Sequence, residues 1–158
     1  MQRARLATQL DCSLTGLVYI LDEPCKGLHY KNVSSIIDTT RHLVDKGNTV
    51  IAIEHNAQYI ASADHVVEMG PEGGPAGGYI VSEHPGEHGF RYLVAFKESR
   101  VCSRFLEVKD ITYRNLKSAS IRLPIGCVTC ISGVSGSGKS SLADIIEEAV
   151  ERGEITTD

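Results

Sequence analysis

The sequence predicts an α/β fold in which a parallel sheet with flanking helices is joined to an antiparallel portion. Residues 17–22 form a continuous apolar run that ends in acids, which is typical of a parallel strand buried on both faces. Strand and helix patterns alternate from there to residue 69. Residues 105–111 and 118–124 alternate apolar with polar side chains, as antiparallel strands with one buried face do.

Helices are expected on both sides of the first strand. Residues 2–10 are good helix formers and place Leu6 and Leu10 on one face. Residues 32–46 carry apolar side chains at helical spacing, and Gly47 supplies the left-handed stop.

A second strand and helix follow, and a loop closes this first unit. Residues 48–55 predict a buried strand, residues 56–63 a short helix and residues 65–69 a third strand. The glycines and prolines of residues 70–78 exclude a helix or a central strand, so this segment is expected to be a loop.

A second unit is expected after a segment without a clear period, residues 84–103. It begins near Arg104 with the two antiparallel strands. The apolar strand "CVTCISG" at 127–133 then runs directly into a glycine-rich loop, and a helix is expected from Lys139 to about Val150.

Composition excludes several classes of protein. Of 158 residues, 42% are hydrophobic and 23% charged, as in an ordinary soluble globular protein. The net charge of -4 provides no basic field for a phosphate backbone, so autonomous DNA binding is not expected. No apolar run is long enough to cross a bilayer, which predicts a cytoplasmic protein with no membrane partner.

The five cysteines are scattered and odd in number, which predicts reduced thiols and no disulfide. Cys127 and Cys130 form a lone C-x-x-C. Without a second pair, these are expected to be small apolar residues on opposite faces of a core strand, with no zinc. Tyr113 could stack on a base, although a tyrosine at the solvent edge is the plainer interpretation.

The segment "GVSGSGKS" at 133–140 fits the phosphate-binding pattern G-x-x-x-x-G-K-[ST] between a strand and a helix. Glycines let the loop curl so that its N–H groups point at phosphate oxygens, and the helix N-terminus adds its positive dipole end. Lys139 would reach the β- and γ-phosphates, and Ser140 would bind Mg²⁺. The alternative, a glycine- and serine-rich turn with a chance lysine, does not account for the flanking strand and helix.

Two strand ends carry further candidate residues. In "YILDEP", Asp22 would hold Mg²⁺ through water and Glu23 would orient the attacking water, whereas a helix-capping acidic turn is the structural alternative. In "IEHN", Glu54 and His55 end another buried strand. His55 could donate to a γ-phosphate, although a histidine at a strand end is more often a structural hydrogen-bonding residue.

Five segments together resemble the ATP-binding cassette ATPases and, among them, the UvrA family, the damage-recognition subunit of the bacterial nucleotide excision nuclease: "QRARLA", "YILDEP", "GLH", "IEHN" and "GVSGSGKSSL". Transporter cassettes usually have GLD where this chain has Gly27, Leu28 and His29. The loop "MGPEGGPAGG" is similar to the one that UvrA proteins carry after the switch histidine. "NLKSASIRLPIG", which precedes the glycine-rich loop, is similar to the approach to the second Walker A of UvrA.

The resemblance implies how the chain is organised. UvrA proteins carry two cassettes, and residues 1–88 would be the C-terminal half of the first, with the signature tail, Walker B, D-loop and switch histidine. Residues 89–103 would be a junction, and residues 104–158 the start of the second cassette with its Walker A. The fold would then be an incomplete or permuted cassette of the P-loop NTPase class. The LSGGE part of the signature is absent, and Cys25 and Lys26 depart from the usual Ser-Ile.

The resemblance also implies ATP and Mg²⁺ as cofactors. In this family each ATP lies between the Walker motifs of one cassette and the signature of the other. Asp22, Glu23 and His55 would then serve catalysis on one nucleotide, with Asp22 and Ser140 as Mg²⁺ ligands, while the glycine-rich loop would serve another. The nucleotide-binding residues of that loop would be Gly133, Ser135, Gly136, Ser137, Gly138, Lys139, Ser140 and Ser141. For a full-length parent, the implied partners are the remaining cassette segments or a second UvrA-like chain, UvrB and damaged DNA, in the SOS response.

Three interpretations stay open. The first is an ATPase portion of a UvrA-like repair protein that, alone, binds nucleotide weakly and hydrolyses it negligibly. The second is a truncated, non-catalytic relative or interaction module. The third is a permuted small cassette in which the strand 127–133 lies beside the strand 17–22, which would bring Lys139 near Asp22 within one chain or through a swapped dimer.

Overall fold

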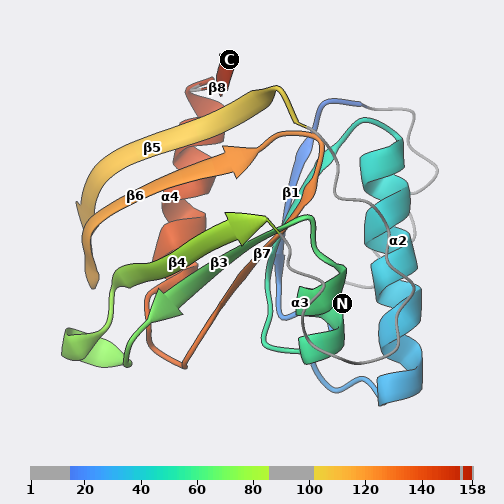
Figure 1. The fold of residues 1–158 in the computed structure, drawn as a ribbon, viewed down its shortest axis with the longest axis horizontal. Coiled ribbons are helices and arrows are strands. Elements are labelled where there is room, and N and C mark those ends of the chain that lie inside the picture. The colour runs from blue at the N-terminus through green and yellow to red at the C-terminus, as the bar shows by residue number, and fades with distance from the viewer. Residues whose placement is uncertain (1–14, 86–101, 154, 158) are drawn as a thin grey trace.

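The computed structural model describes residues 15–85, 102–153 and 155–157 (Figure 1). In chain order its elements are β1 (Val18–Asp22), the 3-10 helix η1 (Tyr30–Asn32), α2 (Val33–Asp45), β2 (Thr49–Ile53), α3 (Ala57–Ser62), β3 (His65–Gly70), the 3-10 helix η2 (Gly74–Ala76), β4 (Tyr79–Pro85), β5 (Arg104–Tyr113), β6 (Leu116–Pro124), β7 (Val128–Gly133), α4 (Lys139–Glu151) and β8 (Ile155–Thr157). The helix expected at residues 2–10 lies outside the described residues.

The described residues form two sheets. A five-stranded sheet has the order β1-β2-β7-β3-β4, in which every pair is parallel except the antiparallel pair β3 and β4. A three-stranded antiparallel sheet has the order β6-β5-β8. The predicted mixed α/β class, with a mainly parallel sheet and an antiparallel portion, is therefore confirmed.

The order of the parallel strands differs from two expectations. β1 lies at the edge of its sheet and is only partly buried, so the prediction of a strand buried on both faces is wrong. The permuted-cassette interpretation placed β7 beside β1, whereas β2 lies between them. β2 and β7 are the strands buried along their length, because each has a neighbour on both sides and helices on both faces.

The core of the described part of the chain consists of two clusters, one on each face of the five-stranded sheet. α2 and α3 cover one face, and α4 with the antiparallel sheet covers the other (Figure 1). Successive residues of β7 face opposite clusters, with Cys130 in the first and Ile131 in the second. This alternation follows from the period of two along a strand, so β7 contributes to both halves of the core.

Polar side chains from the first half of the chain form hydrogen bonds to the backbone at the N-terminal end of β7. The Val128 N–H donates to Asp64 Oδ2 at 2.8 Å, and Arg41 Nη1 donates to the same oxygen at 2.6 Å. The Gly126 N–H donates to Thr49 Oγ1 at 2.9 Å. Asp64 is largely buried, so the Arg41 guanidinium compensates its charge where water does not reach.

The cysteines only partly follow expectation. Cys102 and Cys127 are joined as a disulfide, so the prediction of thiols throughout is wrong for this pair. The two are 25 residues apart in sequence, a separation that carries no local signal. Cys25 and Cys130 are buried thiols, and burial raises the pKa of Cys130 to about 12.

Within the described ranges, no helix has the length and apolar character needed to cross a membrane.

Candidate functional site

The glycine-rich loop connects β7 to α4 at the carboxyl edge of the parallel sheet. Gly133, Gly136 and Gly138 have φ angles of 139°, 77° and 101°, values that residues with a side chain rarely adopt. A Cβ on Gly133 would lie 2.1 Å from the carbonyl oxygen of Met69. The chain therefore needs glycine here both for backbone conformation and for space.

Lys139 is the first residue of α4 and folds back over this loop. Its Nζ donates to the carbonyl oxygens of Gly133 at 3.0 Å and Val134 at 2.8 Å. Partial burial lowers the pKa of Lys139, while Glu23 and Asp22 oppose that shift. The ammonium group is therefore held at the loop, and the charges of Glu23 and Asp22 act on its pKa.

The acidic turn follows β1 at the same edge of the sheet. Asp22 is exposed, and Glu23 has a φ of 46° with its N–H donating to Ile53 O at 2.9 Å. The Glu23 carboxylate pairs with the Lys26 ammonium, and this hydrogen bond and charge lower the pKa of Glu23. The Glu23 carboxylate is therefore engaged by the exposed Lys26 ammonium, and its lowered pKa favours the ionised form.

A hollow of about 350 Å³ brings the acidic turn and the glycine-rich loop together. It is lined by Asp22, Glu23, Ile53, Asn115, Ser135, Gly136, Gly138, Lys139, Ser140 and Ser141. The leading interpretation of the sequence assigned the acids and the loop to different nucleotides, but the structure places them around one hollow, as the permuted-cassette interpretation expected for Lys139 and Asp22. The reason is topological, because β1, β2 and β7 are parallel and their carboxyl ends meet at one edge.

His55 lies in an adjoining hollow of about 360 Å³, which shares Glu23, Ser135 and Lys139 with the first. Its side chain is exposed, as expected of a residue directly after a buried strand. Every predicted site residue except Ser137 thus lines one of these hollows or, like the glycines, shapes the loop. The Ser137 hydroxyl is buried and has no hydrogen-bond partner among the described atoms.

Glu54 has a role that the sequence analysis did not assign. Its side chain is only 1% exposed and accepts three backbone N–H groups: Cys25 at 3.4 Å, His55 at 3.1 Å and Asn56 at 2.9 Å. One buried carboxylate therefore ties the acidic turn to the end of β2. An acid at the end of a fully apolar strand was the available signal.

Asn115 is a second residue that the sequence analysis missed. It sits in the turn between β5 and β6, where its Nδ2 donates to Gly136 O at 3.0 Å and its Oδ1 accepts from the Ser141 hydroxyl at 3.2 Å. It joins the antiparallel sheet to the middle of the glycine-rich loop and to the first turn of α4. Asparagine is common in turns, so its presence at position 115 did not by itself indicate a contact with the glycine-rich loop.

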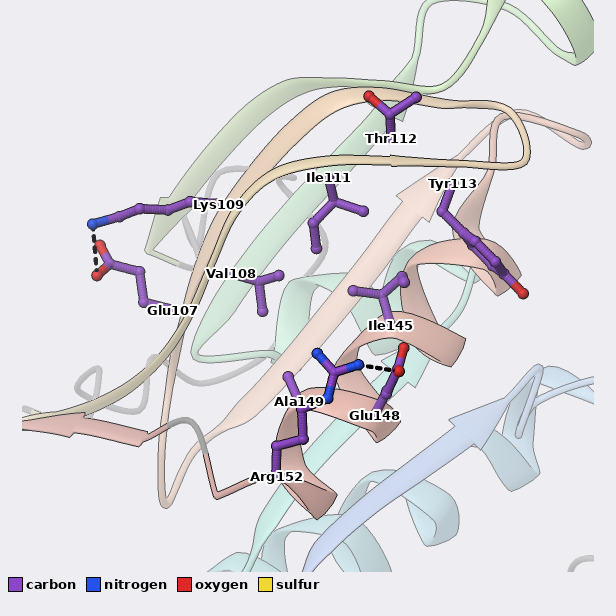
Figure 2. Close-up of a pocket in the computed structure, with 10 residues that line it drawn as sticks. All are labelled: Glu107, Val108, Lys109, Ile111, Thr112, Tyr113, Ile145, Glu148, Ala149 and Arg152. Carbon is purple, nitrogen blue, oxygen red and sulfur yellow. Dashed lines mark hydrogen bonds and ion pairs between the residues drawn. The ribbon is translucent and has the colours of Figure 1, made fainter.

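Tyr113 lines a different hollow of about 520 Å³ between β5 and α4 (Figure 2). Figure 2 shows Val108 and Ile111 facing Ile145 there, all of them part of one core cluster. The Arg114 guanidinium lies 4.8 Å from the centre of the Tyr113 ring. Tyr113 does not line either hollow beside the glycine-rich loop, so stacking on a base, the less favoured of its two interpretations, gains no support here.

The donor set fits a phosphate group with Mg²⁺ better than it fits a protein-held metal. The described residues contain no group of three or more His, Cys, Asp or Glu able to hold an ion. Asp22 and Ser140 supply oxygen atoms to one hollow, and Mg²⁺ characteristically combines one or two protein oxygens with phosphate and water. The positive φ angles of the glycines allow backbone N–H groups of the loop to turn toward a phosphate.

Fold and site together define a mixed α/β protein with a glycine-rich turn and two acids at one edge of a parallel sheet. The chain is 44% identical to the "UvrABC system protein A" of Aquifex aeolicus over 157 residues, covering 90% of this chain and 17% of that protein. The same-named protein of Methanothermobacter thermautotrophicus is 41% identical over 160 residues, covering 92% and 17%. The crystal structure of UvrA2 from Deinococcus radiodurans matches with a TM-score of 0.50 and 33% identity, covering 99% of this chain and 22% of that one.

The chain is therefore a member of the UvrA family over the region compared, as its motifs predicted. It spans 17% of the length of these two curated relatives and so corresponds to a segment of a UvrA protein. No protein-family model matches the chain.

Proposed function

We propose that this chain binds ATP with Mg²⁺ at the hollow between the acidic turn and the glycine-rich loop, as the nucleotide-binding part of a UvrA-like nucleotide excision repair protein. The observation that carries the proposal is the shared lining of this hollow by Asp22, Glu23, Lys139 and Ser140. A phosphate needs cationic and N–H donors, and a phosphate-bound Mg²⁺ needs oxygen ligands. This hollow offers both kinds of group.

Each residue has a distinct part in the proposed site. The backbone of residues 133–138 would receive the phosphate oxygens, and the N-terminus of the 13-residue helix α4 would add its favourable dipole. The Lys139 ammonium would exchange one of its loop carbonyl partners for a phosphate oxygen. Ser140 and Asp22 would hold Mg²⁺, directly or through water, and the bound ion would neutralise phosphate charge.

Glu23 and His55 would act on the terminal phosphate. Glu23 would orient water once it leaves Lys26, and His55 would donate to a γ-phosphate oxygen from the adjoining hollow. In the described structure Glu23 is engaged by Lys26. We therefore propose that the isolated chain binds nucleotide but turns it over negligibly, with DNA damage recognition, UvrB and damaged DNA belonging to a full-length protein in the cytoplasm.

A second candidate is a non-catalytic module that docks on UvrA segments or on a second UvrA-like chain. The same Glu23–Lys26 pair favours it, because an acid held by a neighbouring lysine is poorly placed to activate water. This candidate also predicts nucleotide binding without turnover. The two differ only in whether turnover appears when a partner chain is added.

Equilibrium binding of ATP with Mg²⁺ to the full chain tests the proposal. Lys139→Ala should weaken binding about tenfold or more, because it removes a charged hydrogen bond worth about 1.5–3 kcal/mol. The control Lys109→Ala removes a lysine of the other hollow and should leave affinity unchanged. Absence of binding by the unmodified chain, or equal binding by the Lys139→Ala variant, would contradict the proposal.

Turnover is tested separately. Sustained ATP hydrolysis by the isolated chain that is abolished by both Lys139→Ala and Glu23→Gln would contradict the claim of negligible catalysis. Hydrolysis that survives both changes would come from a contaminant.

A further inference from the structure

A second glycine-rich segment, residues 71–78, lies directly against the glycine-rich loop of the proposed site. It connects β3 to β4, and Figure 1 shows it at lower left, next to the connection from β7 to α4. The Gly74 N–H donates to Gly136 O at 3.0 Å, and the Gly78 N–H donates to Ser137 O at 3.1 Å. We call residues 71–78 the supporting loop.

The two loops are too close for side chains between them. A Cβ on Gly73 would lie 2.3 Å from Ser135 O, and a Cβ on Gly77 would lie 3.2 Å from the Cα of Ser137. A Cβ on Gly78 would lie 1.5 Å from the carbonyl oxygen of Asn115. The contact is backbone against backbone, which explains the glycine at position 73, while the glycine at position 78 is required by the adjoining turn at Asn115.

The antiparallel sheet adds a third support to the same carbonyl groups. Asn115 Nδ2 donates to Gly136 O, so this oxygen receives both Asn115 and Gly74. The Lys117 N–H donates to Gly78 O at 2.9 Å, which ties the supporting loop to β6. The supporting loop is therefore itself fixed in place by β6.

These bonds determine which way the peptide groups of the phosphate loop point. In a planar trans peptide, the C=O and the following N–H point in opposite directions. Because Ser137 C=O is turned toward Gly78, the Gly138 N–H is turned away from the supporting loop. Gly138 lines the hollow, and no described residue accepts its N–H.

We propose that the supporting loop is a positioning element that presets the peptide planes of residues 136–138, so that the Gly138 N–H faces the phosphate before it arrives, while the Ser137 N–H stays bonded to Val134 O at 3.2 Å. This inference rests on the proposed nucleotide binding. Preorganised donors need no rearrangement on binding, so their orientation contributes directly to affinity for the phosphate group.

A glycine outside both loops provides a matched control. Gly73 has an ordinary φ of -90°, so alanine there adds only the clash with Ser135 O. Gly126 has a φ of 79° with nothing within 4 Å of an added Cβ, so alanine there adds backbone strain but no clash. The two variants separate loop contact from general loss of stability.

The measurement is titration of the full chain with inorganic tripolyphosphate, followed by the amide NMR signal of Gly138 and by affinity, with thermal unfolding recorded for each variant. Gly73→Ala should weaken tripolyphosphate binding about tenfold, the value of one hydrogen bond to a charged group, and reduce the shift of the Gly138 signal. Gly126→Ala should bind as the unmodified chain does, although it is the strained variant.

Equal affinities for Gly73→Ala and the unmodified chain would overturn the inference while leaving the proposed function intact. Equal weakening by both variants would also overturn it, because strain would then explain the loss. No binding of tripolyphosphate by the unmodified chain would overturn both. If Gly73→Ala does not fold, Asn115→Ala removes one donor to Gly136 O without adding a clash, and unchanged affinity in that variant would overturn the inference.

Discussion

The two sides of the proposed site are held in place by opposite means. The acidic turn after β1 depends on one buried side chain, Glu54, which accepts the N–H groups of Cys25 and of two residues after β2. The glycine-rich loop depends on backbone carbonyls that accept N–H groups, and on side chains that are absent. Removing the Glu54 carboxylate should therefore destabilise the acidic turn, whereas adding a Cβ to a glycine should destabilise the glycine-rich loop.

The largest effect is expected from breaking the acidic side. Glu54→Ala removes the acceptor of three N–H groups and should lower the free energy of unfolding by about 3 kcal/mol, because a buried donor left unsatisfied costs about 1–3 kcal/mol. Urea unfolding measures this change. Glu54→Gln keeps one carbonyl acceptor and should cost about half as much, and a loss below about 1 kcal/mol in Glu54→Ala would show that Glu54 does not hold the turn.

The glycine side should break when a methyl group is added. Gly133→Ala would bring a Cβ to 2.1 Å from Met69 O, so the backbone must shift, at a cost of roughly 2 kcal/mol in the free energy of unfolding. The control is Gly126→Ala, which has a φ of 79° but nothing within 4 Å, and should cost about 1 kcal/mol. Equal losses by chemical unfolding would mean that conformation alone, without close contact, explains this glycine.

The charge of Lys139 connects the two sides and predicts a pH dependence. Burial lowers the Lys139 pKa, and only the protonated amine attracts phosphate. Affinity for ATP should therefore fall as the pH rises through a value below 10.5, by up to about tenfold per pH unit. Calorimetric binding across alkaline pH measures this, and Lys139→Arg, which stays charged, should show no such fall. An equal fall in the arginine variant would assign the titration to another group.

The smallest effect is expected from the exposed Glu23–Lys26 pair. Lys26→Ala should return the Glu23 pKa toward 4.5, because the Lys26 hydrogen bond is the main cause of its lowering. A lowered carboxyl pKa stabilises the fold above 4.5, and this stabilisation is lost as the pH falls through the folded-state pKa. Carboxyl NMR titration measures the shift, while stability at neutral pH should hardly change because the pair is screened by solvent.

Lys31→Ala is the matched control for that titration, since Lys31 lies in the same connection but forms no ion pair with Glu23. An unchanged Glu23 pKa in Lys26→Ala would show that the pair does not persist in solution.

Local elements were predictable where the pattern is local. The helix expected at residues 32–46 is α2, and the left-handed stop expected at Gly47 has a φ of 87°. α4 begins at Lys139, directly after the glycine-rich loop, as its motif predicted. The supporting loop was recognised as a loop from its glycines and prolines. These features depend on near neighbours in the chain, and the residue pattern records them.

Contacts between distant segments were not predictable in the same way. Nothing in "CVTCISG" indicates that β7 inserts between β2 and β3, and nothing in residues 17–22 indicates an edge strand. The roles of Glu54 and Asn115 appear only once their acceptors and donors have been brought together. The Cys102–Cys127 disulfide likewise joins two residues whose pairing no local sequence pattern indicates.

The amino-acid sequence by itself determined the kinds of element, the glycine-rich loop with its lysine, the pair of acids and the UvrA family. Only the tertiary structure decided that the acids and the loop surround one hollow, and that a second glycine loop supports the first. The physical reason is that spacing along the chain encodes turns and periodicity, whereas strand order and loop contact arise from pairing between segments far apart in the chain, such as Ile53 with Ile131.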